Sequence, residues 1–253
     1  YLYYAKNEPV ISDYDYDMLM NELLEIEKQY PEQITSDSPS QRVGGEITKS
    51  FRPVIHDHVM LSLANTYDRE ELLDFDRRVH SLIPGEDVKY VAELKIDGVA
   101  ISLRYKDNKF AVGVTRGDGV RGDNITTNLR TIKAIPLVTR TVSEAPGDFE
   151  VRGEVFMETK AFEELNRRQE AAGEKIFVNA RNSTAGTLKS LDSKVVARRP
   201  LTMFAYSLIL PDDSKQLVST QWESLQLLEE LGFKMNPNRQ VCNSIEDVID
   251  FWE

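Results

Sequence analysis

One stretch of this sequence, VAELKIDGVAISLRY at residues 91–105, restricts the fold more than any other. Its first half alternates apolar and polar side chains with a period of two, which is the spacing of a β-strand. Read as a strand, it turns Leu94 and Ile96 toward a core. Glu93, Lys95 and Asp97 then share the opposite face, so that one ammonium group lies between two carboxylates.

The dipeptide Asp97-Gly98 predicts a hairpin directly after this strand, because both residues tolerate a positive φ angle. Residues 99–105 would be the return strand, and Lys95 would stand near a strand end that a substrate can reach. Asp107-Asn108 predicts a second hairpin, which leads into KFAVGVTR. Together these segments predict an antiparallel meander of three strands.

Lys95 is a candidate nucleophile. A lysine amine attacks phosphorus or carbonyl centres only when it is deprotonated, whereas an unperturbed ammonium titrates near pH ~10.4. Flanking carboxylates alone would hold the proton, so catalysis needs a cationic ligand, a metal or a second lysine nearby. Asp97 would then orient the amine or help to take its proton. The other interpretation is an ordinary surface ladder of alternating charge, because K-x-D-G is short and occurs often by chance.

Two more motifs follow K-x-D-G, namely TRGDG at residues 115–119 and RGEVF at residues 152–156. In this order the three motifs resemble the nucleotidyltransferase domain of polynucleotide ligases. Residues 3–23, YYAKNEPVISDYDYDMLMNEL, resemble the small domain that only the bacterial NAD-dependent DNA ligases carry. The resemblance covers essentially the whole chain.

The resemblance implies an α+β fold in two domains. Residues 1–48 would form a small helical domain that binds nicotinamide mononucleotide (NMN). Residues 49–253 would form an antiparallel-sheet nucleotidyltransferase domain of the ATP-grasp-like ligase type, truncated at its C-terminus. The D-G-V-V-I-K strand and the K-F-P segment that the family uses around the α-phosphate are absent. We therefore expect this chain to self-adenylate poorly and to be unable to ligate.

The activity that the resemblance implies is NAD-dependent DNA ligation. Lys95 would attack the adenylyl phosphorus of NAD and form lysyl-AMP with release of NMN, while Mg²⁺ offsets phosphate charge. The full enzyme would pass AMP to a 5′-phosphate at a nick in duplex DNA and seal it with the 3′-hydroxyl, in replication and repair. Two alternatives stay open: an ATP- or GTP-using RNA ligase or capping enzyme, and a non-catalytic NAD-binding module.

The amino-terminal segment is expected to be mostly helical. Ser12 or Asp13 can cap a helix that Pro31 ends. An apolar stripe with helical spacing runs along it, formed by Tyr16, Leu19, Leu23, Leu24 and Ile26. The polar segment at residues 37–57 predicts a hinge, which would let this domain close over NAD.

Tyrosines and aspartates cluster beside that stripe. Their spacing alone favours a capped, tyrosine-rich helical pair without a ligand. The resemblance implies instead that they hold the NMN half of NAD, with tyrosine faces on the nicotinamide ring and aspartates accepting hydrogen bonds from ribose and carboxamide. The residues are Tyr3, Tyr4, Asp13, Tyr16 and Asp17, and Tyr4 stands where some relatives carry His.

The resemblance also assigns residues to adenosine. Ser62 and Leu63 match positions that line the adenine pocket, although simple packing explains them about equally well. Arg116 is assigned to the AMP ribose and phosphate, a contact suited to a permanently charged guanidinium. Glu154 lies on the polar face of the predicted strand DFEVRGEVFM, where an exposed glutamate would be ordinary. By resemblance it binds the AMP ribose and helps to position Mg²⁺, which prefers oxygen ligands.

Glu93 and Tyr206 complete the nucleotide candidates. The apolar strand RPLTMFAYSLIL carries Phe204 and Tyr206 on one face. The resemblance favours Tyr206 as the ring that stacks on adenine, whereas core packing fits Phe204 better.

Two cations are assigned to DNA phosphates. Arg181 and Lys189 lie in VNARNSTAGTLKSLD, a segment that runs close to DNA in the family. Ala180 stands where many relatives have proline, and Lys189 stands where many have arginine. A lysine keeps the charge but loses the bidentate fork, so phosphate attraction survives with poorer geometry.

Helix signals are clear in two places. Asp68 predicts the cap of a helix at residues 69–82. Thr220 and Glu223 predict a capping box for a helix that ends at Gly232.

Composition limits the remaining possibilities. The formal charge of −11 argues against a strong autonomous grip on nucleic acid, so we expect this chain alone to be a monomer that binds DNA weakly or not at all. Its single cysteine, Cys242, excludes an internal disulfide and a cysteine-based zinc site within this chain, which suits a reducing cytoplasm. The resemblance implies that this is the bacterial cytoplasm, with a function at the nucleoid. His56, His58 and His80 show no metal-ligand spacing. The chain has no Walker loop, no G-x-G-x-x-G fingerprint and no apolar run of the ~20 residues that span a membrane.

Overall fold

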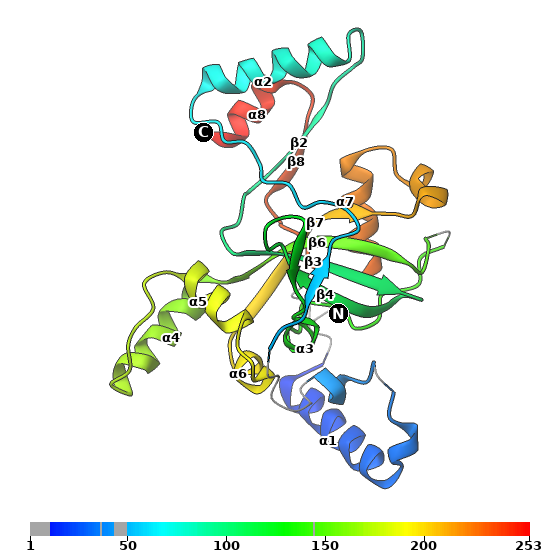
Figure 1. Ribbon diagram of the computed structural model, residues 1–253, viewed down its shortest axis with the longest axis vertical. Coiled ribbons are helices and arrows are strands. Elements are labelled where there is room, and N and C mark those ends of the chain that lie inside the picture. The colour runs from blue at the N-terminus through cyan, green and yellow to red at the C-terminus, as the bar shows by residue number, and fades with distance from the viewer. Residues whose placement is uncertain (1–10, 36, 43–49, 144) are drawn as a thin grey trace.

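The computed structural model describes residues 11–35, 37–42, 50–143 and 145–253 of the chain. Figure 1 shows three parts along its long axis. Helix α1 (Asp13–Gln29) lies at one end, a β-sheet lies in the centre, and the other end is a lobe with helices α2 (Arg69–Leu82) and α8 (Ile245–Trp252).

The central sheet has four antiparallel strands in the order β4-β3-β6-β7. Their bounds are Val99–Lys106 for β3, Lys109–Thr115 for β4, Phe149–Met157 for β6 and Leu201–Ile209 for β7. The predicted hairpin between β3 and β4 is confirmed. Asp107 and Asn108 form its turn with φ angles of 49° and 62°.

Apolar side chains of alternate residues give this sheet its core face. Ile101 and Leu103 of β3 and Val151 and Val155 of β6 are completely buried. They pack in one cluster with residues of helix α3 (Thr126–Arg130) and helix α7 (Gln221–Leu231). The strand DFEVRGEVFM and its alternation are therefore as predicted.

The opposite face of the sheet is polar. Residues directly across an antiparallel pair of strands point to the same side. The pairs between β3 and β6 on this face are Ala100 with Glu154, Ser102 with Arg152, and Arg104 with Glu150.

The predicted hairpin at Asp97-Gly98 is wrong. Strand β2 (Tyr90–Glu93) pairs with β8 (Arg239–Cys242) in a separate two-stranded sheet that belongs to the lobe. Residues 94–98 cross from that sheet to β3, so the three-strand meander does not form. Leu94, which the alternation assigned to the core, is 48% exposed.

Hydrogen bonds explain why the strand stops. Leu94 N–H donates to the Asn238 carbonyl at 3.3 Å, and Asn236 Nδ2 donates to the Leu94 carbonyl at 2.9 Å, so the backbone here is bonded to the loop before β8 and not to β3. Gly98 is needed for close approach, because a Cβ there would lie 2.2 Å from the Val155 carbonyl oxygen.

The remaining elements surround the central sheet. Short strand β1 (Pro53–Ile55) pairs with β5 (Arg121–Asp123). The other helices are η1 (Pro31–Gln33), η2 (Pro39–Arg42), α4 (Thr159–Ala171), α5 (Ala180–Leu188), α6 (Ser193–Ala197) and η3 (Asp212–Leu217).

The capping predictions are confirmed. The Ser12 hydroxyl accepts from Asp15 N–H at the start of α1, and the Asp68 carboxylate accepts from Glu71 N–H at the start of α2. Thr220 and Glu223 form the complete capping box of α7, which ends at Gly232 with φ 104°.

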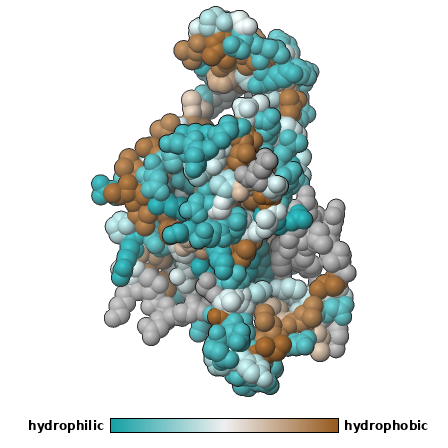
Figure 2. Space-filling model, turned by 90° about the vertical axis from the view of Figure 1, so that its right-hand side faces the viewer, coloured by the Kyte–Doolittle hydropathy of each residue, from teal (hydrophilic) through white to brown (hydrophobic). Residues whose placement is uncertain are grey.

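The apolar stripe of α1 does not form a core with the described residues. Leu19 keeps an exposed fraction of 57%, and Leu24 and Ile26 each keep 47%. Figure 2 shows such apolar side chains on the surface of the part that Figure 1 identifies as α1. This helix therefore adds little buried apolar area to the described structure.

The side chain of His56 contacts backbone carbonyl groups at the end of β4. It is buried, and its Nε2 lies 3.1 Å from the Thr115 carbonyl oxygen and 3.2 Å from that of Arg116. Among the described helices, none has the length and apolar character needed to cross a membrane.

We predict that Thr220→Ala lowers the free energy of unfolding by about 1 kcal/mol, because the N-cap hydroxyl that accepts from Glu223 N–H is lost. Urea denaturation followed by circular dichroism measures this loss. The control is Ser219→Ala, because Ser219 takes part in the cap through its backbone N–H. Equal stability of the two variants would contradict the predicted contribution of the cap.

Candidate active site

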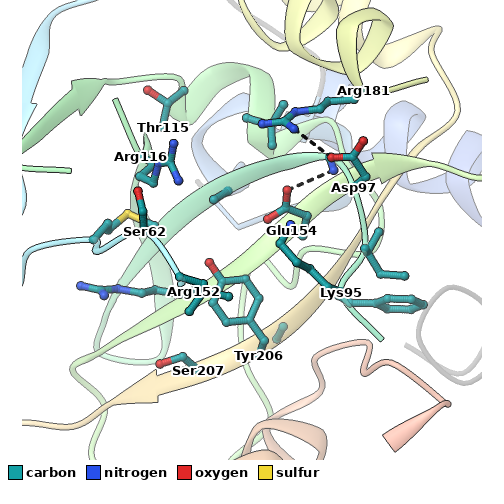
Figure 3. Close-up of a pocket in the computed structure, with 18 of the residues that line it drawn as sticks. Ser62, Lys95, Asp97, Thr115, Arg116, Arg152, Glu154, Arg181, Tyr206 and Ser207 are labelled. Carbon is teal, nitrogen blue, oxygen red and sulfur yellow. Dashed lines mark hydrogen bonds and ion pairs between the residues drawn. The ribbon is translucent and has the colours of Figure 1, made fainter. Parts of the chain in front are cut away.

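A cavity of about 850 Å³ opens on the polar face of the central sheet. Its walls are the sheet itself, residues 59–65 and residues 93–100 (Figure 3). Cavities of this size hold ligands as large as a nucleotide. The predicted residues that line it are Ser62, Leu63, Glu93, Lys95, Asp97, Arg116, Glu154, Arg181, Lys189 and Tyr206.

Lys95 lies on the crossing segment between the two sheets and not within a strand. The bonds of Leu94 to Asn236 and Asn238 fix the segment on one side of the lysine. On the other side, Gly98 N–H donates to Glu154 Oε1 at 3.1 Å. The segment that carries Lys95 is thus hydrogen-bonded, on both sides of the lysine, to elements that are distant in sequence.

Glu154 lies in the cavity and is hydrogen-bonded to the backbone of the segment that carries Lys95 (Figure 3). Burial raises its pKa above the ordinary value. The hydrogen bond from Gly98 and the positive charges of Lys95 and Arg181 oppose that rise in pKa. Glu154 therefore binds its proton more tightly than a solvated glutamate while it anchors the segment that carries Lys95.

Asp97 is exposed and forms an ion pair with Arg181, whose Nη1 lies 3.0 Å from Asp97 Oδ1. Lys189 Nζ lies 3.2 Å from Asp123 Oδ2 in a similar pair. Both cations that were predicted to meet DNA phosphates line the cavity, and both already have a carboxylate partner. A phosphate would have to compete with these carboxylates.

Tyr206 and Phe204 project from β7 into the cavity. Burial and the negative charge of Glu154 raise the pKa of Tyr206 to about 12, so its hydroxyl keeps its proton at neutral pH. The expectation that Phe204 belongs to the core is wrong. Its ring lines the cavity and packs on Phe156 with the centroids 4.8 Å apart, because residues 204 and 206 share a face of the strand.

Glu93 closes the side of the cavity next to the lobe. Its Oε2 is buried and has no hydrogen-bond partner within the described chain. Burial raises the pKa of Glu93, and the charge of Arg239 acts in the opposite direction. An unsatisfied buried acceptor of this kind favours a ligand that brings a donor.

Ser62 and Leu63 lie in the wall opposite the sheet, and Arg116 follows β4. Leu63 is 76% exposed, which does not fit the interpretation of simple packing. Arg116 is held by its backbone, whose N–H donates to the Ala100 carbonyl at 3.1 Å.

Of the five small-domain candidates, only Tyr16 has a described side chain. Tyr3 and Tyr4 lie outside the described residues, and for Asp13 and Asp17 only the backbone is described. Tyr16 does not line the cavity, and Lys133 Nζ lies 6.0 Å from the centroid of its ring.

Sequence reasoning missed several lining residues, among them Arg152, Ser207, Gln221 and Asn236. Arg152 could have been found, because it precedes Glu154 by two positions and shares its face of β6. Gln221 and Asn236 gave no local signal, since they reach the cavity from a helix start and from a loop.

Among the described residues, no group of three or more His, Cys, Asp or Glu side chains could hold a metal ion. Glu154 fits as a single oxygen ligand. Mg²⁺ commonly takes one or two carboxylates and completes its shell with water and substrate phosphates.

The antiparallel sheet, with a lysine, carboxylates and an aromatic ring around one cavity, defines an α+β nucleotidyltransferase. Residues 48–253 match the model of the NAD-dependent DNA ligase adenylation domain, and residues 1–44 match that of the DNA ligase-like, N-terminal NAD+-binding domain. The chain belongs to the NAD-dependent DNA ligase adenylation domain family.

Similar proteins include DNA ligases from several bacteria. Identity is 48% with the DNA ligase of Thermotoga maritima, 47% with that of Pseudothermotoga lettingae and 50% with that of Desulforamulus reducens. These matches cover 100%, 100% and 99% of this chain, respectively. They cover 36%, 36% and 37% of the relatives, so the chain spans little more than a third of their length.

We predict that Glu154→Gln changes the pH dependence of stability. A glutamate whose pKa is raised on folding contributes stability below its unfolded pKa, and this contribution is lost as pH rises through the folded pKa. The amide keeps an acceptor for Gly98 N–H but does not ionise. Relative to the unchanged chain, the variant should therefore gain stability as pH rises from about 4 to about 7.

Urea midpoints measured across this range test the prediction. Glu158→Gln is the control, because Glu158 is exposed and lies outside the cavity. A stability difference for Glu154→Gln that stays constant with pH would contradict a raised pKa.

Proposed function

We propose that this chain performs the adenylation step of an NAD-dependent DNA ligase. The observation that carries the proposal is that one cavity gathers Lys95, Glu154 and Tyr206 from three separate segments. Lys95 Nζ attacks the adenylyl phosphorus of NAD and forms a nitrogen–phosphorus bond. The bond between that phosphorus and the bridging oxygen breaks, NMN leaves with the electron pair, and AMP remains on the lysine.

The cavity supplies contacts for both ends of the adenylyl group. Tyr206 offers a flat aromatic ring, with a protonated hydroxyl, on which the base can stack. The unpartnered Glu93 Oε2 accepts from a donor on the polar edge of the base. Ser62 and Leu63 close the opposite wall. Arg116 and Glu154 bind the phosphate and ribose, with a permanent cation and an oxygen acceptor, respectively.

The attacking amine must lose its proton. Asp97 lies two residues from Lys95, and we assign it to orient the amine or take this proton. Its ion pair with Arg181 brings a guanidinium to the same region of the cavity. Mg²⁺, when bound, would offset charge on the phosphates, and Glu154 would be its protein ligand.

The small domain, proposed as residues 1–48, binds the NMN half of NAD. Its contacts are assigned to Tyr3, Tyr4, Asp13, Tyr16 and Asp17. Tyr16 does not line the cavity in this structure, and we propose that the domain closes over NAD when NAD binds.

The longer protein would transfer AMP to the 5′-phosphate of a nick in duplex DNA and seal it, in replication and repair at the bacterial nucleoid. Arg181 and Lys189 are assigned to DNA phosphates. This chain alone should bind DNA weakly, since its formal charge is −11 and both cations are already paired. We also propose that the isolated chain is a monomer.

Intact mass spectrometry after incubation with NAD and Mg²⁺ tests the proposal. We expect slow, substoichiometric addition of one AMP, no addition with ATP, and complete loss of the adduct in Lys95→Ala. Lys89→Ala is the control, because Lys89 is exposed and does not line the cavity. An adduct that survives in Lys95→Ala would reject Lys95 as the nucleophile. Absence of any adduct, also in a longer chain that spans its relatives, would leave a nucleotide-binding module without catalysis.

A further inference from the structure

The wall of the cavity opposite the sheet is held in an unusual way. We define the wall segment as residues 55–65, which run from the last residue of β1 toward α2. Leu61 and Leu63 are 80% and 76% exposed, so apolar packing does not fix this part of the segment. The buried side chain of Met60 and the polar contacts earlier in the segment therefore determine where its cavity-lining residues stand.

Arg152, which lines the cavity, makes two of these polar contacts. Its Nη2 donates to the His58 carbonyl at 2.6 Å and its Nη1 donates to the Val59 carbonyl at 3.1 Å. Its Nε donates to Glu150 Oε1 at 3.0 Å. All three guanidinium nitrogens thus have acceptors, so Arg152 is engaged by the protein, although it lines the cavity.

The bonds of Arg152 join the wall segment to the strand that carries Glu154. Arg152 and Glu154 lie two positions apart on the same face of β6. Glu150, the buried partner of Arg152, also lies 3.6 Å from His58 Nδ1 through its Oε2. One residue further along the wall segment, Met60 N–H donates to the Gly119 carbonyl at 2.9 Å.

A second arginine makes a similar contact outside the cavity. Arg104 Nη2 donates to the Ile55 carbonyl at 2.7 Å, and its Nη1 lies 3.2 Å from Asp57 Oδ2. Arg104, Ile55 and Asp57 do not line the cavity. This arginine is therefore a matched control for Arg152.

We propose that Arg152 is a positioning residue that sets the distance between the wall segment and the nucleotide-bearing face of the sheet. It acts through the carbonyl groups of His58 and Val59, which precede Ser62 and Leu63 by only a few residues. The inference rests on the proposed function in that the cavity takes an adenylyl group. Loss of the contact leaves the chemistry at Lys95 intact but lets the wall separate from the base.

Arg152→Lys tests this inference. A lysine keeps a positive charge for the buried Glu150, but it cannot bond two carbonyl groups and a carboxylate with the planar fork of a guanidinium. We expect the dissociation constant for AMP, measured by calorimetry, to rise about tenfold. The same change at the other arginine, Arg104→Lys, should leave it within about twofold.

The half-saturating NAD concentration and the maximal rate of adduct formation, measured separately, distinguish a positioning role from a general structural effect. In Arg152→Lys the NAD concentration that gives half the maximal rate of adduct formation should rise, while the maximal rate at saturating NAD stays the same. An unchanged dissociation constant in Arg152→Lys, or an equal loss in Arg104→Lys, would overturn the inference.

Two further experiments test the inference when Arg152→Lys does not fold or when no nucleotide binds. If Arg152→Lys does not fold, the neutral pair Glu150→Gln with Arg152→Gln removes both charges together and takes the same tests. Hydrogen exchange at residues 58–63 examines the wall without any nucleotide, and faster exchange in Arg152→Lys than in Arg104→Lys is expected. If the unchanged chain binds no AMP, the proposed function fails, whereas equal exchange in the two variants rejects the role of Arg152 alone.

Discussion

The position of β6 between β3 and β7 is the constraint on which the site depends. Backbone hydrogen bonds hold this strand on both edges, so its side chains can only alternate between the two faces of the sheet. Val151 and Val155 therefore enter the core, while Arg152 and Glu154 enter the cavity. A one-residue shift of register would bury the charges and expose the valines, so the core and the site fix each other.

The second constraint is electrostatic. Carboxylates in the cavity are partly removed from water, which raises the pKa of Glu93 and Glu154. At the mouth of the cavity, Arg181 is paired with Asp97 and Lys189 with Asp123. An anionic ligand at either cation would have to displace an existing carboxylate contact. The chain as a whole also has a net negative charge.

Lys95 depends on long-range contacts more than on its own strand. The short sheet of β2 and β8 brings the loop before β8 to the backbone on one side of it, and Glu154 anchors the other side. The lysine thus stands where the lobe meets the central sheet. Any movement of the lobe against the sheet would change the position of the amine relative to a phosphate bound on the sheet.

Local sequence determined the elements whose signals lie within a few residues. Asp68 and the pair Thr220 and Glu223 marked helix starts, and Asp107-Asn108 marked a hairpin, because caps and tight turns are formed by neighbouring groups. Alternation along β6 placed Glu154 on the polar face. The resemblance of the motifs around Lys95, Arg116 and Glu154 to a known family, and not local pattern alone, pointed to the residues that line the cavity.

Only the tertiary structure decided which strands pair and what stands around the lysine. Asp97-Gly98 looked like a hairpin, yet β2 pairs with β8, which follows it by more than a hundred residues. No nearby sequence pattern predicts that pairing or the contacts of Asn236 and Arg152. A strand edge or a carbonyl group can bond with a partner from any part of the chain. The sequence by itself determined the chemical groups of the site and, for β6, the face of the strand on which they lie. Their distances were decided by long-range hydrogen bonds, which form only when the complete sheet and lobe have packed.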